Sequence, residues 1–254
     1  MKFSPILGIG LTAAVLVTGA FAAQQAATVK PVIETTPVMA VALVDNKPAT
    51  AGDAARGQTK AGSCAACHGA DGNAADPQYP KLAGQHELYT ARHLALFQNG
   101  GRENAIMMGM AAALNAQDMR DVGAYFASQK VLAGIGDDTT IGEGPNKDKK
   151  FYQVGERIYR GGKADGTPSC IACHGPTGRG IPGPSYPAVG GQHATYTVAK
   201  LVAFKTGTVW GKDTQANVVM KAAARNLSDE EIQALATYLQ GLHNAADGQG
   251  ASAK

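Results

Sequence analysis

The sequence predicts an all-α protein formed by tandem duplication of one small helical domain. The phrase SCAACHG at Ser63 returns as SCIACHG at Ser169. The segments that follow also match, YPKLAGQHELYTARHLALFQNG from Tyr79 and YPAVGGQHATYTVAKLVAFKTG from Tyr186. Apolar residues recur at spacings of three and four, and no alternating strand pattern of useful length is present. The repeated unit of ~80–90 residues suits a small domain.

Each copy is expected to begin and end with a helix. The closing segments LNAQDMRDVGAYFASQ and LSDEEIQALATYLQGL match, and Ser228 with Glu231 forms a capping box at the start of the second. The opening helices contain Gly57 and Gly155, where the missing side chain lets another helix cross closely. Between them, the spacing predicts a further helix over Tyr89–Phe97 and its counterpart over Tyr196–Phe204.

The composition is that of a globular protein, with 44% hydrophobic and 17% charged residues. Aromatic residues make up only 6%, so a small domain would lack bulky core side chains unless another group filled its centre. The formal net charge is +3, with no basic cluster interleaved with aromatics. This pattern argues against nucleic-acid binding.

The first 22 residues match an export signal. Lys2 supplies the positive start, Ile6–Val17 the apolar run, and Ala20-Phe21-Ala22 the small-residue cleavage site. A retained anchor is the alternative, but the run is short for a bilayer span of ~20 residues. The sequence therefore predicts a periplasmic protein, in a compartment where four cysteines would by default pair as disulfides.

The chain is expected to divide into six segments. These are a signal peptide, a flexible Pro- and Ala-rich tether, a first domain, a Gly-rich linker, a second domain and a disordered tail, at residues 1–22, 23–52, 53–131, 132–150, 151–243 and 244–254.

Each copy contains the motif Cys-x-x-Cys-His, as Cys64, Cys67, His68 and Cys170, Cys173, His174. A shared zinc site would need two distant pairs to meet, and a thiol–disulfide redox pair would need a βαβ context that is missing here. Covalent haem attachment explains every part of the motif. The two thiols add across the two vinyl groups, and the adjacent histidine ligates the iron.

The sixth iron ligand decides between electron transfer and small-molecule chemistry. The candidate methionines are Met107, Met108 and Met110 in the first copy and Met220 in the second. Counted back from the leucine before the last helix, Met107 and Met220 occupy matching positions, whereas Met110 corresponds to Ala223. Met107 and Met220 are therefore the predicted ligands, with Met110 in reserve.

Four other histidines have different predicted roles. His86 and His193, each in a Gly-Gln-His triplet, are rival sixth ligands, although the triplet also suits the start of a helix, where its side chains satisfy backbone donors. His93 and His243 lack matching histidines and are expected at the surface.

The ring of each proximal histidine needs a fixed acceptor for its second nitrogen. The carbonyls of Pro80 and Pro187, in matching Tyr-Pro pairs, are the candidates.

Residues 52–243 resemble the exported two-haem class I cytochromes c of the cytochrome c4 type. The resemblance is carried by AACHG, YPKLAGQ and GAYFASQ in the first copy, and by RGGKADGTPSCIACHGP, GGQHATYT and TYLQGLH in the second. It implies two cytochrome c-like domains, each wrapped round one covalent haem c with His/Met ligation, and electron transfer in the periplasm toward terminal oxidases. The axial methionines of that family fall on Met107 and Met220.

The predicted function is therefore electron transfer, with redox proteins as partners and neither a catalytic residue nor a small-molecule substrate. The long 23–52 stretch also suggests loose membrane association. Two alternatives remain. One is a haem subunit of a larger periplasmic dehydrogenase, for instance a flavin-linked one oxidising sulfur compounds. The other is a di-haem peroxidase, which would need one copy to lack its methionine.

Overall fold

The computed structural model describes residues 49–183, 186–211 and 218–244, and it confirms the all-α prediction. In these ranges the only β-type pairings are isolated bridges, Thr140 with Lys150 and Ile181 with Tyr186. The described residues of both copies belong to one compact unit. The predicted signal peptide, almost all of the tether and nearly the whole tail lie outside the described residues. Among those described, no helix has the length and apolar character needed to cross a membrane.

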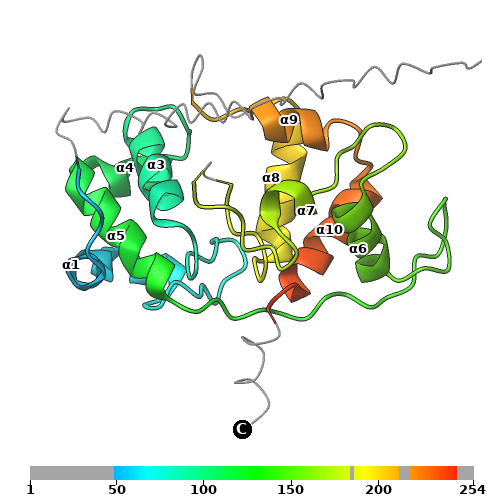
Figure 1. Ribbon diagram of the computed structural model, residues 1–254, viewed down its shortest axis with the longest axis horizontal. Helices are drawn as coiled ribbons and strands as arrows, with labels where there is room; N and C mark the ends of the chain where they lie inside the picture. Colours follow the sequence, from blue (N-terminus) through cyan, green and yellow to red (C-terminus); the bar gives the residue numbers. More distant parts are fainter. Residues whose placement is uncertain (1–48, 184–185, 212–217, 245–254) are drawn as a thin grey trace, which may run out of the picture. The chain divides into compact units, whose positions relative to one another are not determined.

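The two copies contain the same helices in the same order (Figure 1). The first copy consists of α1 (Ala54–Lys60), a 3-10 turn (Ala61–Ser63), α2 (Ala65–His68), α3 (Glu87–Gln98), α4 (Ala105–Ala112) and α5 (Ala116–Ser128). The second copy consists of α6 (Phe151–Gly161), α7 (Ile171–His174), α8 (Ala194–Lys205), α9 (Val218–Ala224) and α10 (Asp229–Gly241). The correspondence confirms the tandem duplication.

In each copy the first and last helices pack together, α1 against α5 and α6 against α10. The predicted glycines lie at these crossings. A Cβ on Gly57 would come within 1.9 Å of the Asp121 carbonyl oxygen, and one on Gly155 within 2.0 Å of the Ala234 carbonyl oxygen. No larger residue fits between these backbones, which confirms the predicted close crossing.

Both closing helices begin with the predicted caps. In α10 the Ser228 hydroxyl accepts from the Glu231 N–H at 3.1 Å, and the Glu231 carboxylate accepts from the Ser228 N–H at 2.8 Å. Asn115 and Asp118 make the same reciprocal pair in α5, at 2.9 and 3.1 Å. These bonds satisfy backbone donors that the first helical turn leaves unpaired.

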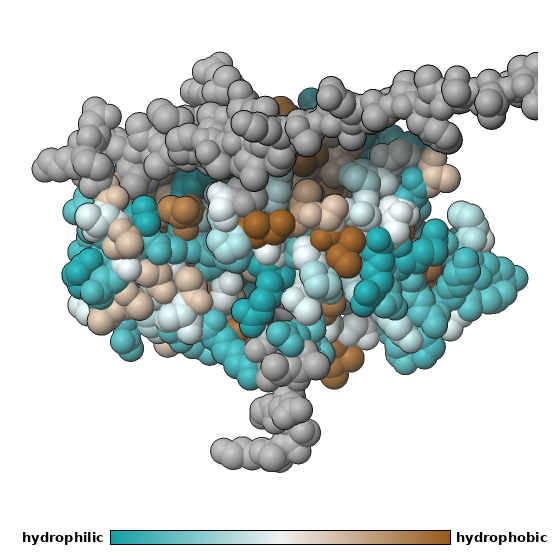
Figure 2. Space-filling view, viewed as in Figure 1, coloured by the Kyte–Doolittle hydropathy of each residue, from teal (hydrophilic) through white to brown (hydrophobic). Residues whose placement is uncertain are grey.

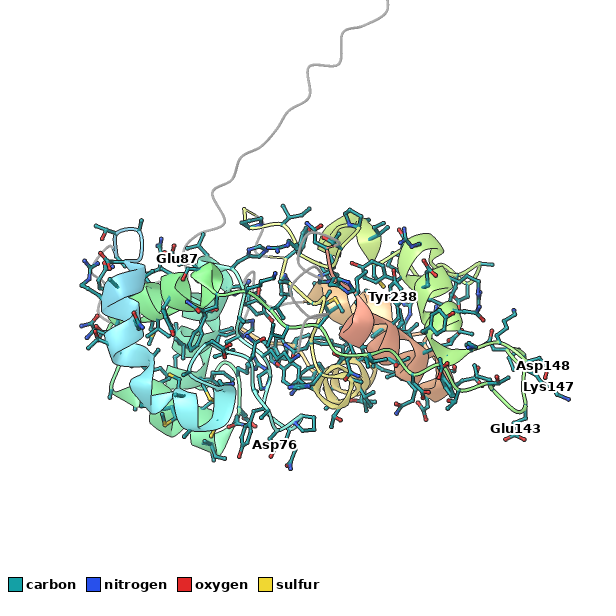
Figure 3. The ribbon with its side chains drawn as sticks, turned by 90° about the horizontal axis from the view of Figure 1, so that it is seen from below. Asp76, Glu87, Glu143, Lys147, Asp148 and Tyr238 are labelled. Atoms are coloured by element: carbon teal, nitrogen blue, oxygen red, sulfur yellow. The ribbon has the colours of Figure 1, made fainter. Side chains whose placement is uncertain are left out.

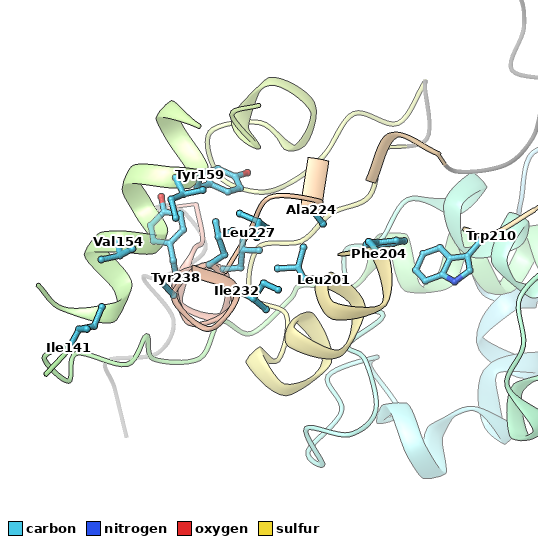
Figure 4. Packing of buried hydrophobic residues seen from close by; sticks show 14 of the residues in the cluster. Ile141, Val154, Tyr159, Leu201, Phe204, Trp210, Ala224, Leu227, Ile232 and Tyr238 are labelled. Atoms are coloured by element: carbon cyan, nitrogen blue, oxygen red, sulfur yellow. The ribbon is translucent and has the colours of Figure 1, made fainter. Parts of the chain in front are cut away.

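Among the described residues there are two apolar cores, one centred on each copy. The first is built from α3, α5 and neighbouring residues, with Met119 and Phe126 fully buried. The second is centred on α6 and α10, where Tyr159 packs against Tyr238 with ring centroids 5.4 Å apart (Figure 4). Both cores also include a partly buried methionine and the first cysteine of the copy's motif.

The segment 132–150, expected as a linker, contacts the second copy. The Gly134 N–H donates to the Gln240 carbonyl at 2.9 Å, and Ile141 is buried in the second core. Charged residues Glu143, Lys147 and Asp148 lie on a loop that extends away from the helices (Figure 3). The segment therefore combines ordered contacts with an exposed charged loop.

Candidate haem sites

Both Cys-x-x-Cys-His motifs fold into a single short helical turn, α2 in the first copy and α7 in the second. In each turn the histidine N–H donates to the carbonyl of the first cysteine at 2.9 Å. All four cysteines are half-buried, and none of them forms a disulfide. Each turn presents two thiols and one imidazole from a five-residue stretch, as covalent haem attachment requires.

The two proximal histidines are buried and held in one orientation. The Nδ1 of His68 lies 2.8 Å from the Pro80 carbonyl oxygen, and the Nδ1 of His174 lies 2.9 Å from that of Pro187. A carbonyl only accepts, so Nδ1 carries the proton and Nε2 keeps its lone pair for a metal. The structure thus confirms the two prolines as acceptors.

Burial favours the uncharged form of both histidines and of the first cysteine in each motif. It lowers the pKa of His68 and His174, which favours the neutral imidazole that ligates iron. It also raises the pKa of the Cys64 thiol, and that of Cys170 to about 11. A redox-active or zinc-binding cysteine needs the opposite shift, toward thiolate. In the part of the chain that the structure describes, no three His, Cys, Asp or Glu side chains converge as a metal-binding group.

The two predicted methionines lie in equivalent environments. Met107 on α4 and Met220 on α9 are half-buried, and each packs against the same core as the first cysteine of its copy. By contrast, Met108 and Met110 are exposed, at 38% and 37%. Asn104 caps α4 by accepting from the Met107 N–H at 2.9 Å, which anchors the backbone at this residue.

The two histidines of the Gly-Gln-His triplets, His86 and His193, are the N-cap residues of α3 and α8, where each contacts the other copy. His193 Nε2 lies 2.8 Å from the Ala74 carbonyl oxygen, so this nitrogen forms a hydrogen bond with the first copy and not with a group of its own copy. Burial lowers the pKa of His86, which contacts the Arg179 backbone. These contacts favour a role for the triplet at the junction of the two copies.

His93 departs from the prediction. It was expected at the surface because its counterpart is Lys200, but it is only 7% exposed. Its Nδ1 accepts from Arg102 at 3.0 Å, and its ring packs edge-on against Trp210 with centroids 5.0 Å apart. Burial and the neighbouring arginine hold its pKa well below the usual range. The tight junction between the copies explains the difference, since a residue on the outer face of one domain is covered by the other.

The sequence did not identify the other residues that join the copies. Gln85 and Gln192 form hydrogen bonds across the junction, and so does Arg102. The duplicated Gly-Gln-His triplet was a signal, but nothing local distinguishes an amide that bridges two domains from one that caps a helix.

The residues of each turn fit a haem c group. Two half-buried thiols and a neutral imidazole with an oriented Nε2 lie together, and a half-buried methionine lines the same core in both copies. The sparse aromatic content is also consistent with a prosthetic group that fills space within each domain.

Comparison with known proteins agrees with this geometry. The family model for cytochrome c matches residues 54–130 and 154–243. The chain is 44% identical to cytochrome c4 of Pseudomonas aeruginosa, over 76% of this chain and 90% of that protein. It is 36% identical to the thiosulfate dehydrogenase electron acceptor of Stutzerimonas stutzeri, over 74% and 82%.

A solved structure adds the fold. Reduced cytochrome c4 from Pseudomonas stutzeri superposes with a TM-score of 0.67 at 40% identity, covering 76% of this chain and all of that one. Its match extends over both copies and thus over both Cys-x-x-Cys-His turns. The chain therefore belongs to the cytochrome c4 family of the cytochromes c: it is an electron carrier with two covalently bound haem c groups and redox proteins as partners.

Proposed function

We propose that the protein carries single electrons between periplasmic redox proteins through two six-coordinate His/Met irons. The thioether links are assigned to Cys64, Cys67, Cys170 and Cys173, and the axial ligands to His68, Met107, His174 and Met220. One observation carries the proposal. In both copies a proline carbonyl orients the proximal imidazole, and an equivalent methionine packs on the same core as the first cysteine.

Each haem, when bound, supplies an iron that alternates between the ferrous and ferric states. The chain's own residues hold the imidazole proton on Nδ1, bury the ligands and keep water from the core. With a methionine at the sixth position in both copies, neither site is left open to a substrate, which argues against the peroxidase alternative.

Terminal oxidases are the proposed acceptors. The alternative is a haem partner of a dehydrogenase that oxidises sulfur compounds, and it is supported by the likeness to the thiosulfate dehydrogenase electron acceptor. On the face drawn in Figure 2, apolar side chains form separate patches among hydrophilic ones. Such a face suits a small transient interface rather than a permanent one.

The periplasmic location and loose membrane association rest on the first 52 residues. Mass spectrometry of the protein from its native cells would identify a mature chain that begins after Ala22. A retained first residue would instead support an uncleaved anchor. Recovery in the soluble fraction only after a salt wash would support the loose association.

The ligand assignment is tested by replacing Met107 or Met220 with alanine. Oxidised His/Met cytochromes absorb weakly through methionine-to-iron charge transfer, so each variant should lose about half of this absorbance because one of two Fe–S bonds is removed. The controls are Met108→Ala and Met110→Ala, which remove exposed neighbours on the same helix and should leave the band unchanged. An undiminished band in both ligand variants would disprove the assignment.

The partner is tested by native mass measurement of the protein from its source cells. A free carrier should run at the mass of the single chain, whereas a dehydrogenase subunit should co-migrate with a larger protein. Stopped-flow kinetics would then show whether a purified thiosulfate dehydrogenase reduces the protein directly, and rapid reduction would support that enzyme as its electron donor.

A further inference from the structure

Two glutamines from the repeated Gly-Gln-His triplet reach across the junction in opposite directions. The Gln85 amide donates from Nε2 to the Ala188 carbonyl at 3.0 Å, and its Oε1 accepts from the Ala188 N–H at 3.0 Å. Gln192 does the same in reverse. Its Nε2 donates to the Lys81 carbonyl at 3.0 Å, and its Oε1 accepts from the Lys81 N–H at 2.9 Å.

The glutamine orientations are set by these networks. The Gln85 oxygen accepts a second bond from its own neighbour, the His86 N–H, at 3.0 Å, and the Gln192 oxygen accepts from the His193 N–H at 3.1 Å. Two N–H groups therefore point at each oxygen, and a carbonyl faces each amide nitrogen. No rotated amide would satisfy the same partners.

Each bridge ends on the peptide group that holds the other copy's proximal histidine. The peptide between Pro80 and Lys81 accepts from His68 Nδ1 through its carbonyl and donates to Gln192 through its N–H. The peptide between Pro187 and Ala188 likewise joins His174 to Gln85. In both cases a single peptide links a proximal imidazole to a side chain of the opposite copy.

Hydrogen bonds in such a chain polarise one another. A peptide whose N–H is engaged has a more negative carbonyl oxygen, which draws the imidazole proton more strongly. The imidazole then becomes a more basic ligand, and a more basic axial ligand favours the ferric state. Losing the glutamine should therefore raise the reduction potential of the haem whose histidine it supports.

We propose that each glutamine tunes the haem of the opposite copy. Gln192 lowers the reduction potential of the haem ligated by His68, and Gln85 lowers that of the haem ligated by His174. Both act as positioning residues through the proline peptide. The inference rests on the proposed histidine ligation and deepens the proposed function, because docking of the two domains then sets the potentials between which the electron moves.

The test uses the full-length protein with both haems, as Gln85→Leu and Gln192→Leu. Haem potentials are measured by spectroelectrochemical titration, with each haem assigned by NMR. We expect Gln85→Leu to raise the reduction potential of the haem ligated by His174 and to leave that of the other haem unchanged. Gln192→Leu should raise the potential of the haem ligated by His68 and leave that of the other unchanged. In the reduced protein, the Nδ1 proton of the affected histidine should shift upfield and exchange faster with solvent.

Gln85→Glu and Gln192→Glu serve as matched variants, because a carboxylate still accepts from the proline-peptide N–H. The potential of the opposite haem should then not rise. The inference would be overturned by a higher potential of the opposite haem in either glutamate variant. It would also be overturned if the leucine variants shifted the potentials of both haems together, or of neither, and the glutamines would then be structural links only. Absence of the methionine-to-iron absorbance from the wild type would instead overturn the proposed His/Met ligation, and would be distinguished in this way from failure of the glutamine inference.

Discussion

Among individual residues, Asp121 is a buried carboxylate whose hydrogen-bond partners are all groups of the protein. It lies on α5 with its side chain 1% exposed. It accepts hydrogen bonds from the Asp53 N–H at 2.9 Å, from Arg56 Nε at 2.8 Å and from Gln117 at 2.9 Å. The bond from Arg56 is the main cause that lowers the pKa of Asp121 to about 2. This network joins the start of the first domain to its last helix.

The low pKa of Asp121 predicts acid sensitivity. Because the folded pKa is depressed, its stabilisation is complete above the unfolded value of about 4 and is lost as the pH falls toward 2. Asp121→Asn should therefore flatten the fall in stability over this range and cost about 1–3 kcal/mol at neutral pH. Denaturant unfolding followed by circular dichroism at several pH values measures both effects.

Glu103→Gln, at an exposed carboxylate, is the control and should leave the pH profile unchanged. The second domain has Ala234 at the equivalent position and therefore lacks this carboxylate. Equal pH profiles for the wild type and Asp121→Asn would contradict the prediction.

At the scale of the elements, the helix crossings depend on the absence of one side chain in each copy. Gly155→Ala would force a Cβ to within 2.0 Å of the Ala234 carbonyl oxygen, so α6 and α10 must separate. We expect a loss of about 1–3 kcal/mol or more in the free energy of unfolding, as for other overpacked sites.

Gly161→Ala is the matched control for this crossing. Gly161 is the last residue of the same helix, and its Cβ would meet nothing within 4 Å. This variant should be as stable as the wild type or slightly more stable, because alanine has the higher helix propensity. Similar denaturant midpoints for the two variants would show that the crossing is not as tight as described.

At the scale of the whole molecule, one arginine gathers aromatic rings from both copies. The Arg102 guanidinium lies 4.0 Å from the centre of the Trp210 ring and 4.6 Å from that of Phe97. It also donates to the Tyr196 hydroxyl at 2.9 Å and to His93 Nδ1 at 3.0 Å. Through these cation–π contacts and hydrogen bonds, the Arg102 guanidinium stabilises the contact between the two domains.

Arg102→Leu should uncouple the unfolding of the two domains. The wild type is expected to unfold in a single calorimetric transition, whereas the variant should show two, because the contacts that Arg102 makes across the junction are lost. Lys200→Leu removes a cation that lies over the Tyr196 ring, 5.2 Å from the ring centre, and should keep one transition. A single transition in Arg102→Leu would mean that the glutamine bridges couple the domains without it.

The sequence by itself determined the opening, middle and closing helices of each copy and the duplication, and it predicts the members of each haem site. Cys-x-x-Cys-His, the capping boxes and the crossing glycines are local patterns. Residues only a few positions apart determine the backbone geometry at each of them. Even the Pro80 and Pro187 carbonyls lie only 12 and 13 residues from their histidines, and matching the copies was enough to identify them.

Only the tertiary structure decided how the two copies meet. The Gln85, Gln192 and Arg102 bonds join residues 94 to 111 positions apart, and the side chains that make them are equally suited to solvent or to a helix cap. His93 was misplaced for the same reason, because its burial comes from the other domain. No local periodicity encodes such contacts, since they depend on which outer surfaces the two folded domains press together.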